Sequence, residues 1–190
     1  MIRELIEKNR SYRRFQQNQS ISLDTLRGLI DLARLSATSR NSQPLVFMPL
    51  CDPEVNAEVF RLILSWKGQI PEWPGPEEGE RPAAYILILG DREISSSFGV
   101  DPGIAAQSIL LGAAEMGLGG GMMGSLKKEE ARKLLEIPEQ YEILLTLALG
   151  KPAEEVVLET LDKGQNTKYW MDEQGVHHVP KRRLEDLIIQ

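Results

Sequence analysis

Apolar residues recur at helical spacing in several segments of the chain. In SLDTLRGLIDLARL the apolar positions lie three and four residues apart behind Ser22, which is a favourable N-cap. The segment DPGIAAQSILLGAAEMG begins with Asp101, a residue that caps helices, and ends at Gly117, a residue that stops them. After a short N-terminal helical turn, the pattern therefore predicts helices at 22–35, 53–66, 101–117, 127–136 and 180–189, with Ser125 as the cap of the helix at 127–136.

Other apolar segments are too short for helices and almost continuously apolar. LVFMPL at 45–50 is a candidate for a short strand, and AAYILILG at 83–90 and YEILLTLALG at 141–150 are typical of strands that are covered on both faces. A glycine-rich stretch at 119–123 predicts a further strand. Because helices and strands alternate without repeats or an internal linker, the sequence predicts one domain over 1–190, with an α+β fold and a three-layer α/β/α core.

Two stretches interrupt this regular pattern. KGQIPEWPGPEEGERP at 67–82 contains four prolines and three glycines, which exclude a regular helix or a central strand. Loops of this length are typically functional or mobile, and Ile70 and Trp73 are apolar residues that look exposed in it. A basic tail at 165–190 contains KRR at 181–183.

Composition limits the partners of the chain. Its 190 residues are 42% hydrophobic and 26% charged, and the formal net charge is -6, whereas nucleic-acid-binding domains are usually basic. Apolar stretches fall short of the ~20 residues that span a bilayer, and the charged beginning IRELIEKN is unlike a signal peptide. Cys51 is alone, which suits a reducing compartment. We expect a cytoplasmic protein that binds neither nucleic acid nor membrane.

Familiar catalytic and metal-binding motifs give weak signals. GGGMMG at 119–124 satisfies G-x-G-x-x-G, but a helix precedes it where a dinucleotide-binding unit requires the first strand. G-x-S-x-G and H-E-x-x-H motifs do not occur in the sequence. His177 and His178 are neighbours in an extended segment, so their side chains point to opposite faces and a shared metal is disfavoured. A Ser-His-Asp triad that uses them stays open on spacing alone.

Groups that bind anions and flat rings gather in four short segments. NRSYRRF at 9–15 carries three arginines, SATSRNSQP at 36–44 is rich in amides and hydroxyls, and a glycine run and KRR follow at 119–121 and 181–183. Guanidinium groups bind a phosphate dianion, amides match the hydrogen-bonding edge of a heteroaromatic ring, and glycine lets a backbone approach its face. Flavin mononucleotide (FMN) combines such a phosphate with such a ring.

These segments resemble, in order and over nearly the whole chain, the motifs of the FMN-dependent nitroreductase family. The family's Arg-Arg-Ser-x-Arg-x-Phe-like motif corresponds to 9–15, with Asn9 at its first arginine, and its Ala-Pro-Ser-x-x-Asn-x-Gln-Pro motif corresponds to 36–44. The stretches 101–124 and 135–154 resemble two further family segments. The closing Lys-x-Arg of the family matches Lys181 and Arg183.

The resemblance implies a set of cofactor-binding residues. Positive charge near the start and end of the chain is expected to hold the FMN phosphate and to favour the anionic reduced flavin. Since the flavin carries the chemistry, no catalytic side chain and no metal are expected. The implied cofactor-binding residues are Arg10, Ser11, Arg13, Thr38, Ser39, Asn41, Gln43, Gly120, Gly121, Met122, Lys181 and Arg183.

The resemblance also implies an assembly. Family members are homodimers with swapped termini, and each flavin lies at the subunit interface, so the segment around Asn41 is expected to come from the partner. The Ala- and Gly-rich helix at 103–117 is a candidate for central dimer packing. An ordinary buried helix has a similar composition.

The implied reaction is a two-stage electron transfer. NADH or NADPH delivers a hydride to flavin N5 and leaves, and a small acceptor such as a nitroaromatic or a quinone then binds on the same face. Trp66, Ile70 and Trp73 are candidates for lining the substrate slot, or they only anchor the loop to the surface. The alternatives are a flavin-binding carrier or sensor without turnover and a different flavin reaction such as reductive dehalogenation.

Overall fold

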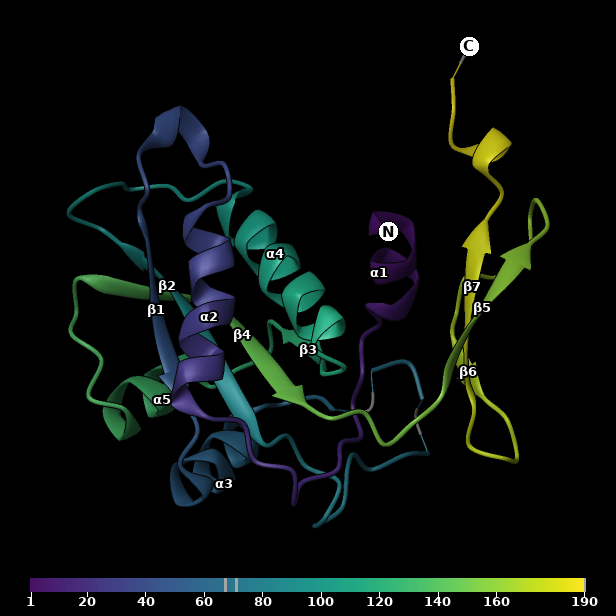
Figure 1. The fold of residues 1–190 in the computed structure, drawn as a ribbon, viewed down its shortest axis with the longest axis horizontal. Coiled ribbons are helices and arrows are strands. Elements are labelled where there is room, and N and C mark those ends of the chain that lie inside the picture. The colour runs from purple at the N-terminus through teal and green to yellow at the C-terminus, as the bar shows by residue number, and fades with distance from the viewer. Residues whose placement is uncertain (67, 71, 190) are drawn as a thin grey trace.

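The structure is a computed structural model that describes residues 1–66, 68–70 and 72–189. Its main sheet has the strand order β1-β2-β4-β3, and each strand is antiparallel to its neighbours. Helices cover both faces of this sheet (Figure 1). The strands of the sheet are β1 (Leu45–Leu50), β2 (Ala84–Asp91), β3 (Gly119–Met123) and β4 (Tyr141–Gly150). The helices are α1 (Ile2–Lys8), α2 (Leu23–Arg34), α3 (Pro53–Leu62), α4 (Asp101–Glu115) and α5 (Lys128–Leu134).

Two hydrophobic clusters, one on each face of the sheet, confirm the predicted three-layer α+β core. Residues of β2 alternate between them: Ile86 and Ile88 pack with residues of α2 and α4, whereas Tyr85 and Leu87 pack with residues of α3 and α5. Every residue of β2 is therefore buried. This double burial explains why the sequence of β2 is continuously apolar instead of alternating.

Several predicted elements are confirmed and two helix starts need correction. Ser22 caps α2 by accepting a hydrogen bond from the backbone N–H of Thr25 at 3.1 Å, as predicted. Asp101 is the first residue of α4 rather than its cap, and its buried carboxylate accepts instead from the backbone N–H of Ser39 at 3.1 Å. Helix α5 begins at Lys128, two residues later than a cap at Ser125 would give.

The helix predicted at 53–66 ends earlier, at Leu62. Ile63 forms an antiparallel bridge with Leu126, and the backbone N–H of Leu64 donates to the carbonyl of Ser125 at 2.7 Å. Pairing with the chain after β3 thus replaces the last helical turn. The same pairing uses the backbone of Ser125, which the prediction assigned to a helix cap.

A second, three-stranded sheet near the C-terminus was not predicted. It has the order β5-β7-β6, formed by β5 (Val156–Leu161), β6 (Trp170–Met171) and β7 (His177–Arg182), with β5 parallel to β7. The predicted helix at 180–189 is wrong: Pro180 lies in β7, and a single 3-10 turn, Leu184–Asp186, follows. Pro180 stands opposite Glu159 in the parallel pairing with β5, and β6 is too short to pair with it from the other side.

The N-terminal segment connects the two sheets. In Figure 1, α1 lies between α4 and the C-terminal sheet. Ser11 then bridges Gly120 of β3, the backbone N–H of Tyr12 donates to the Gly120 carbonyl at 3.0 Å, and Phe15 bridges Pro152 after β4. The basic residues at 9–15 are thereby placed between β3 and β7. Among the helices that the structure describes, none has both the length and the apolar character needed to cross a bilayer.

Candidate functional site

Two cavities adjoin at the N-terminal segment because Ser11 and Arg13 line both of them. The first has a volume of about 280 Å³ and is bounded by β3 and the residues after it, from Gly121 to Ser125. The second has a volume of about 330 Å³ and lies against the C-terminal sheet. We call the second one the basic cavity because it is lined by three cationic side chains, those of Arg10, Arg13 and Lys181.

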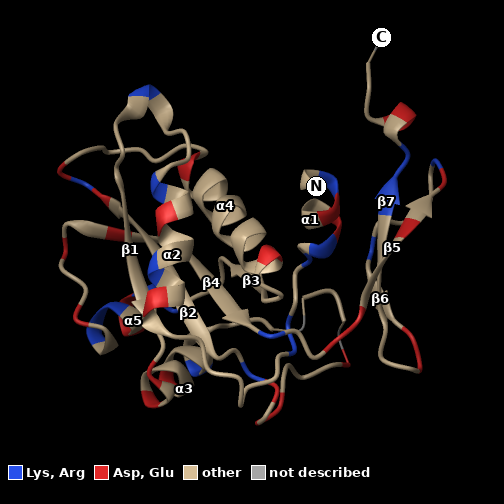
Figure 2. Ribbon diagram, viewed as in Figure 1, with Lys and Arg blue, Asp and Glu red and all other residues tan. Residues whose placement is uncertain are grey.

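The basic cavity brings together residues that are about 170 positions apart in the sequence. Figure 2 shows basic residues on the chain that follows α1 and on β7. Lys181 lines the cavity with Arg10 and Arg13, as the prediction of a shared phosphate site requires. Arg183 does not join them: its guanidinium pairs with Asp162. Arg10 also donates to the carbonyl of Ile6 at 2.6 Å, which fixes its side chain at the end of α1.

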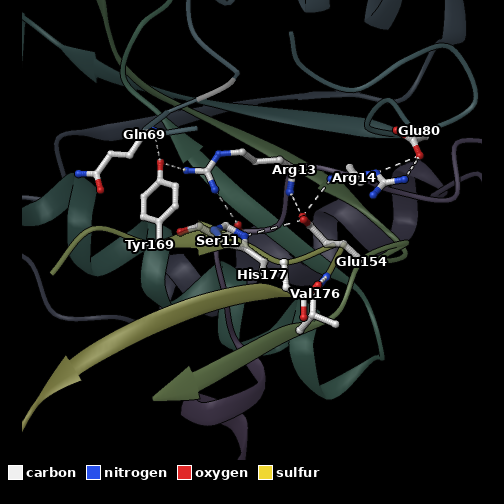
Figure 3. A network of polar contacts seen from close by, with 10 residues as sticks. Ser11, Arg13, Arg14, Gln69, Glu80, Glu154, Tyr169, Val176 and His177 are labelled. Carbon is white, nitrogen blue, oxygen red and sulfur yellow. Dashed lines mark hydrogen bonds and ion pairs between the residues drawn. The ribbon is translucent and has the colours of Figure 1, made fainter. Parts of the chain in front are cut away.

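Arg13 is the centre of a polar network that links three segments (Figure 3). Its guanidinium donates to the hydroxyl of Tyr169 at 3.1 Å and lies 5.0 Å from the centroid of the Tyr169 ring. The same hydroxyl accepts from the backbone N–H of Gln69 at 2.7 Å. The loop at 67–82 therefore reaches the basic cavity through its described first residues. Residues 67 and 71 lie outside the part of the chain that the structure describes.

Glu154 holds the backbone of this network. One of its carboxylate oxygens accepts from the backbone N–H groups of both Arg13 and Arg14, the latter at 3.1 Å. Its side chain is only 1% exposed, and this burial raises the pKa of Glu154, while the two N–H donors act in the opposite direction. Arg14 itself pairs with Glu80, away from the basic cavity. The peptide of Arg13 is thus held independently of its guanidinium.

His177 lies beside Glu154, with 3.9 Å between Nδ1 and a carboxylate oxygen. The residue is 2% exposed and lines the basic cavity. Within the described part of the chain, neither ring nitrogen of His177 has a hydrogen-bond partner. Burial, together with the charge of Arg13, lowers the pKa of His177 to about 4, so this imidazole is neutral at pH 7 in the protein alone.

His178 points to the opposite face, as predicted for neighbours in a strand. Its Nδ1 lies 2.6 Å from a carboxylate oxygen of Glu159 and its Nε2 lies 3.2 Å from one of Asp172. Trp170 stacks on its ring with 4.1 Å between centroids. The hydrogen bond to Asp172 and the second carboxylate raise the pKa of His178. The two histidines therefore sit in separate environments.

The predicted residues at 38–43 are placed elsewhere in the protomer. Thr38 and Gln43 line a cavity of about 400 Å³ between α2 and β1, and Ser39 lines another beside residues 94–99. Asn41 is exposed, and φ values of 50° to 54° at Arg40, Asn41 and Gln43 put three residues that are not glycine in the left-handed region. One protomer does not bring this segment to the basic cavity. Its contact with a cofactor stays a prediction.

The glycine run of β3 has two different surroundings. Gly121 and Met122 line the first cavity. At Gly120, however, a Cβ atom would lie 2.5 Å from the carbonyl oxygen of Ala148, and at Gly119 it would lie 2.4 Å from the ring of Tyr12. The absence of a side chain at these two positions is therefore explained by packing against the protein itself. The expected cofactor contact of Gly120 stays untested.

The tryptophans predicted for a substrate slot differ in burial. Trp66 is 6% exposed and stacks on Phe60, with 5.0 Å between ring centroids, so its placement favours the alternative that it anchors the loop. Gly75 reinforces this anchor, because a Cβ there would lie 3.0 Å from that of Trp66. Trp73 and Ile70 are half-buried, which corrects the expectation that they are exposed. Their role at a substrate slot stays a prediction.

The chain belongs to the nitroreductase family, whose model matches residues 6–151. An NADPH-dependent oxidoreductase of Staphylococcus haemolyticus is 24% identical to it over 177 residues, covering 81% of this chain and 66% of that protein. The chain thus spans slightly less than two thirds of the length of the curated relatives it matches.

Solved structures show the same fold. A nitroreductase family protein of Streptococcus pneumoniae superposes with a TM-score of 0.68 at 16% identity, covering 87% of this chain and 95% of that one. The NADPH:FMN oxidoreductase of Vibrio harveyi, solved in complex with NAD+, has a TM-score of 0.63 at 25% identity, covering 80% of this chain and 68% of that one. The family match ends at residue 151, so the C-terminal wall of the basic cavity lies beyond it.

Proposed function

We propose that this protein is an FMN-dependent NAD(P)H oxidoreductase that reduces a small organic acceptor such as a nitroaromatic or a quinone. One observation carries the proposal: three cations from the two ends of the chain meet in a cavity that adjoins a second cavity walled by β3. Membership of the nitroreductase family and relatives named as NADPH-dependent and FMN oxidoreductases support it.

The residues around the two cavities fit FMN. Arg10, Arg13 and Lys181 supply the charge that a phosphate dianion needs, and Arg10 Nε and both nitrogens of His177 are buried donors or acceptors without a partner among the described residues. Gly121 and Met122 would lie along the ring or the ribityl chain. When bound, FMN would accept a hydride at N5 and pass electrons to the acceptor. The protein's part is to bind, orient and shield it.

We further propose that the working unit is a homodimer in which each partner lends Thr38, Ser39, Asn41 and Gln43 to the other's flavin. Four apolar residues of the C-terminal segment support exchange of termini because they are largely exposed in one protomer: Leu184, Leu187, Ile188 and Ile189. Loop residues near Trp73 would then border the acceptor site.

Light scattering is expected to give a mass twice the 21.3 kDa of one chain. Asn41→Asp keeps a residue type that tolerates the left-handed backbone, so this mass should stay unchanged. The substitution replaces the amide NH₂ donor by a carboxylate that only accepts hydrogen bonds, so FMN binding should weaken. A monomer that binds FMN as tightly as the dimer would contradict the shared site.

The enzyme proposal is tested by titrating the FMN-loaded protein with NADH or NADPH without oxygen. Bleaching of the flavin absorbance, followed by its return when a quinone or nitroaromatic is added, is the expected result. Bound FMN that neither nucleotide bleaches would favour the carrier or sensor alternative. Bleaching without reoxidation by either acceptor would favour a different flavin reaction.

A further inference from the structure

We propose that His177 is a ligand of the FMN phosphate and that it binds this anion as an imidazolium, taking up a proton as the phosphate enters the basic cavity. This inference rests on the proposed function. It concerns a residue of β7, beyond the residues that the family model matches, and it adds to the three cations already assigned to the cavity.

The geometry places the imidazole between the carboxylate of Glu154 and the basic cavity. Glu154 lies behind it, 3.9 Å from Nδ1, and the basic cavity lies in front of it. The ring is fixed in this position because the edge of Tyr169 packs against it, with 4.9 Å between centroids and planes at 67°. A protonated ring in this position donates toward Glu154 from one nitrogen and toward the phosphate from the other.

The unpaired state of the ring indicates a ligand. Buried polar atoms without a partner are rare in folded proteins, because each one loses its hydrogen bonds to water without a replacement. Both nitrogens of His177 are in this state within the described chain, and only 2% of the residue is exposed. A phosphate oxygen in the adjoining cavity provides the missing acceptor.

Burial and the nearby charges determine the protonation of His177, and burial, the largest of these influences, disfavours the charged ring. Arg13 from the N-terminal segment, Arg10 at the end of α1, and Lys181 and His178 on its own strand disfavour the imidazolium. Glu154 favours it, and the hydroxyl of Tyr169 is engaged with Arg13. A phosphate dianion reverses this balance, because it neutralises the surrounding cations and adds two negative charges on the open side.

Binding of the anion and protonation of His177 are linked. The pKa of His177 is about 4 in the protein alone and rises when the anion binds. Between these two pKa values the complex holds more protons than the separate partners, so binding consumes protons. FMN affinity therefore gains a contribution from His177 as the pH falls through the pKa of the complex, and this contribution is absent for riboflavin, which has no phosphate.

Calorimetry tests the proposal on the flavin-free full-length protein. FMN is titrated at pH 7 in phosphate-free buffers that differ in ionisation enthalpy, which gives the number of protons taken up. We expect wild type to take up more protons than His177→Gln, and His177→Gln to bind FMN about tenfold more weakly. His178→Gln is the matched control, since that ring faces Glu159 and Asp172, and it should match wild type.

A second measurement needs no substitution at His177. The chain has two histidines, so NMR titration of ¹³C-labelled imidazole carbons resolves both, and the spectrum of His178→Gln assigns them. Addition of FMN should raise the titration midpoint of His177 from the acidic range toward or above neutrality. Riboflavin should leave it in place.

Three results would overturn the inference: equal proton uptake by wild type and His177→Gln, a titration midpoint of His177 that FMN does not move, or an equal loss of riboflavin and FMN affinity in His177→Gln. The last of these would show that His177 has only a structural role. Wild-type protein that binds no FMN overturns the proposed function and the inference together. FMN binding with an unmoved His177 overturns the inference alone.

Discussion

Arg13→Ala is expected to weaken FMN binding about thirtyfold, which corresponds to about 2 kcal/mol for a charge-assisted contact to a dianion. Arg13 has the central position, because it lines both cavities and its guanidinium is oriented by Tyr169. The hydrogen bond from its backbone N–H to Glu154 survives the substitution, so the chain path at 9–15 is retained. Quenching of FMN fluorescence on titration into the flavin-free protein measures the change.

Arg14→Ala is the matched control for this experiment. It also removes a guanidinium group, one residue further along the chain, but the guanidinium of Arg14 pairs with Glu80 and lies away from the basic cavity. FMN affinity should therefore change less than threefold. If Arg13→Ala and Arg14→Ala had equal affinities for FMN, the assignment of Arg13 to the phosphate site would be wrong.

The sequence was enough to predict the core of the fold because each core strand and helix is marked by the apolar pattern of its own residues. Strands β1, β2 and β4 are apolar on both faces, and this holds wherever helices cover both sides of a sheet. The C-terminal sheet was missed because its evidence is distant. Val156 pairs with His177 through a parallel register across 21 positions, and half-buried strands such as β5 carry no continuous apolar run.

The same distinction separates the predicted from the unpredicted residues of the site. The basic segments at the two ends of this acidic chain are visible in the sequence, and their resemblance to family motifs predicted Arg10, Arg13 and Lys181, which the structure brings to one cavity. Their contact with a cofactor stays a prediction. Glu154 and Tyr169 were not, because an isolated Glu or Tyr is usually exposed and only the tertiary contacts with Arg13 reveal their roles. The strand geometry of the two adjacent histidines did imply that one of them turns inward, which is a signal that could have pointed to His177.

The glycine run gives the second large effect, on stability rather than on binding. Gly120→Ala is expected to lower the free energy of unfolding by about 2–3 kcal/mol, because the added Cβ would lie 2.5 Å from the Ala148 carbonyl oxygen, inside the β3–β4 pairing. A carbonyl in the middle of a sheet cannot rotate away as a flexible side chain can. The strands have to separate locally, and Leu110 and Leu149, whose methyl groups lie within 3 Å of the same point, have to move as well.

Urea unfolding of the flavin-free protein measures this change without a contribution from cofactor, and one fixed chain concentration makes the effect of dimer mass action the same for every variant. Gly124→Ala is the control, because Gly124 lies four residues further along the chain, is exposed, and has open space around its Cβ position. Its free energy of unfolding should stay within about 0.5 kcal/mol of wild type. If Gly120→Ala were as stable as Gly124→Ala, packing could not explain the glycine at 120, and the cofactor contact implied by the family motif would become its better explanation.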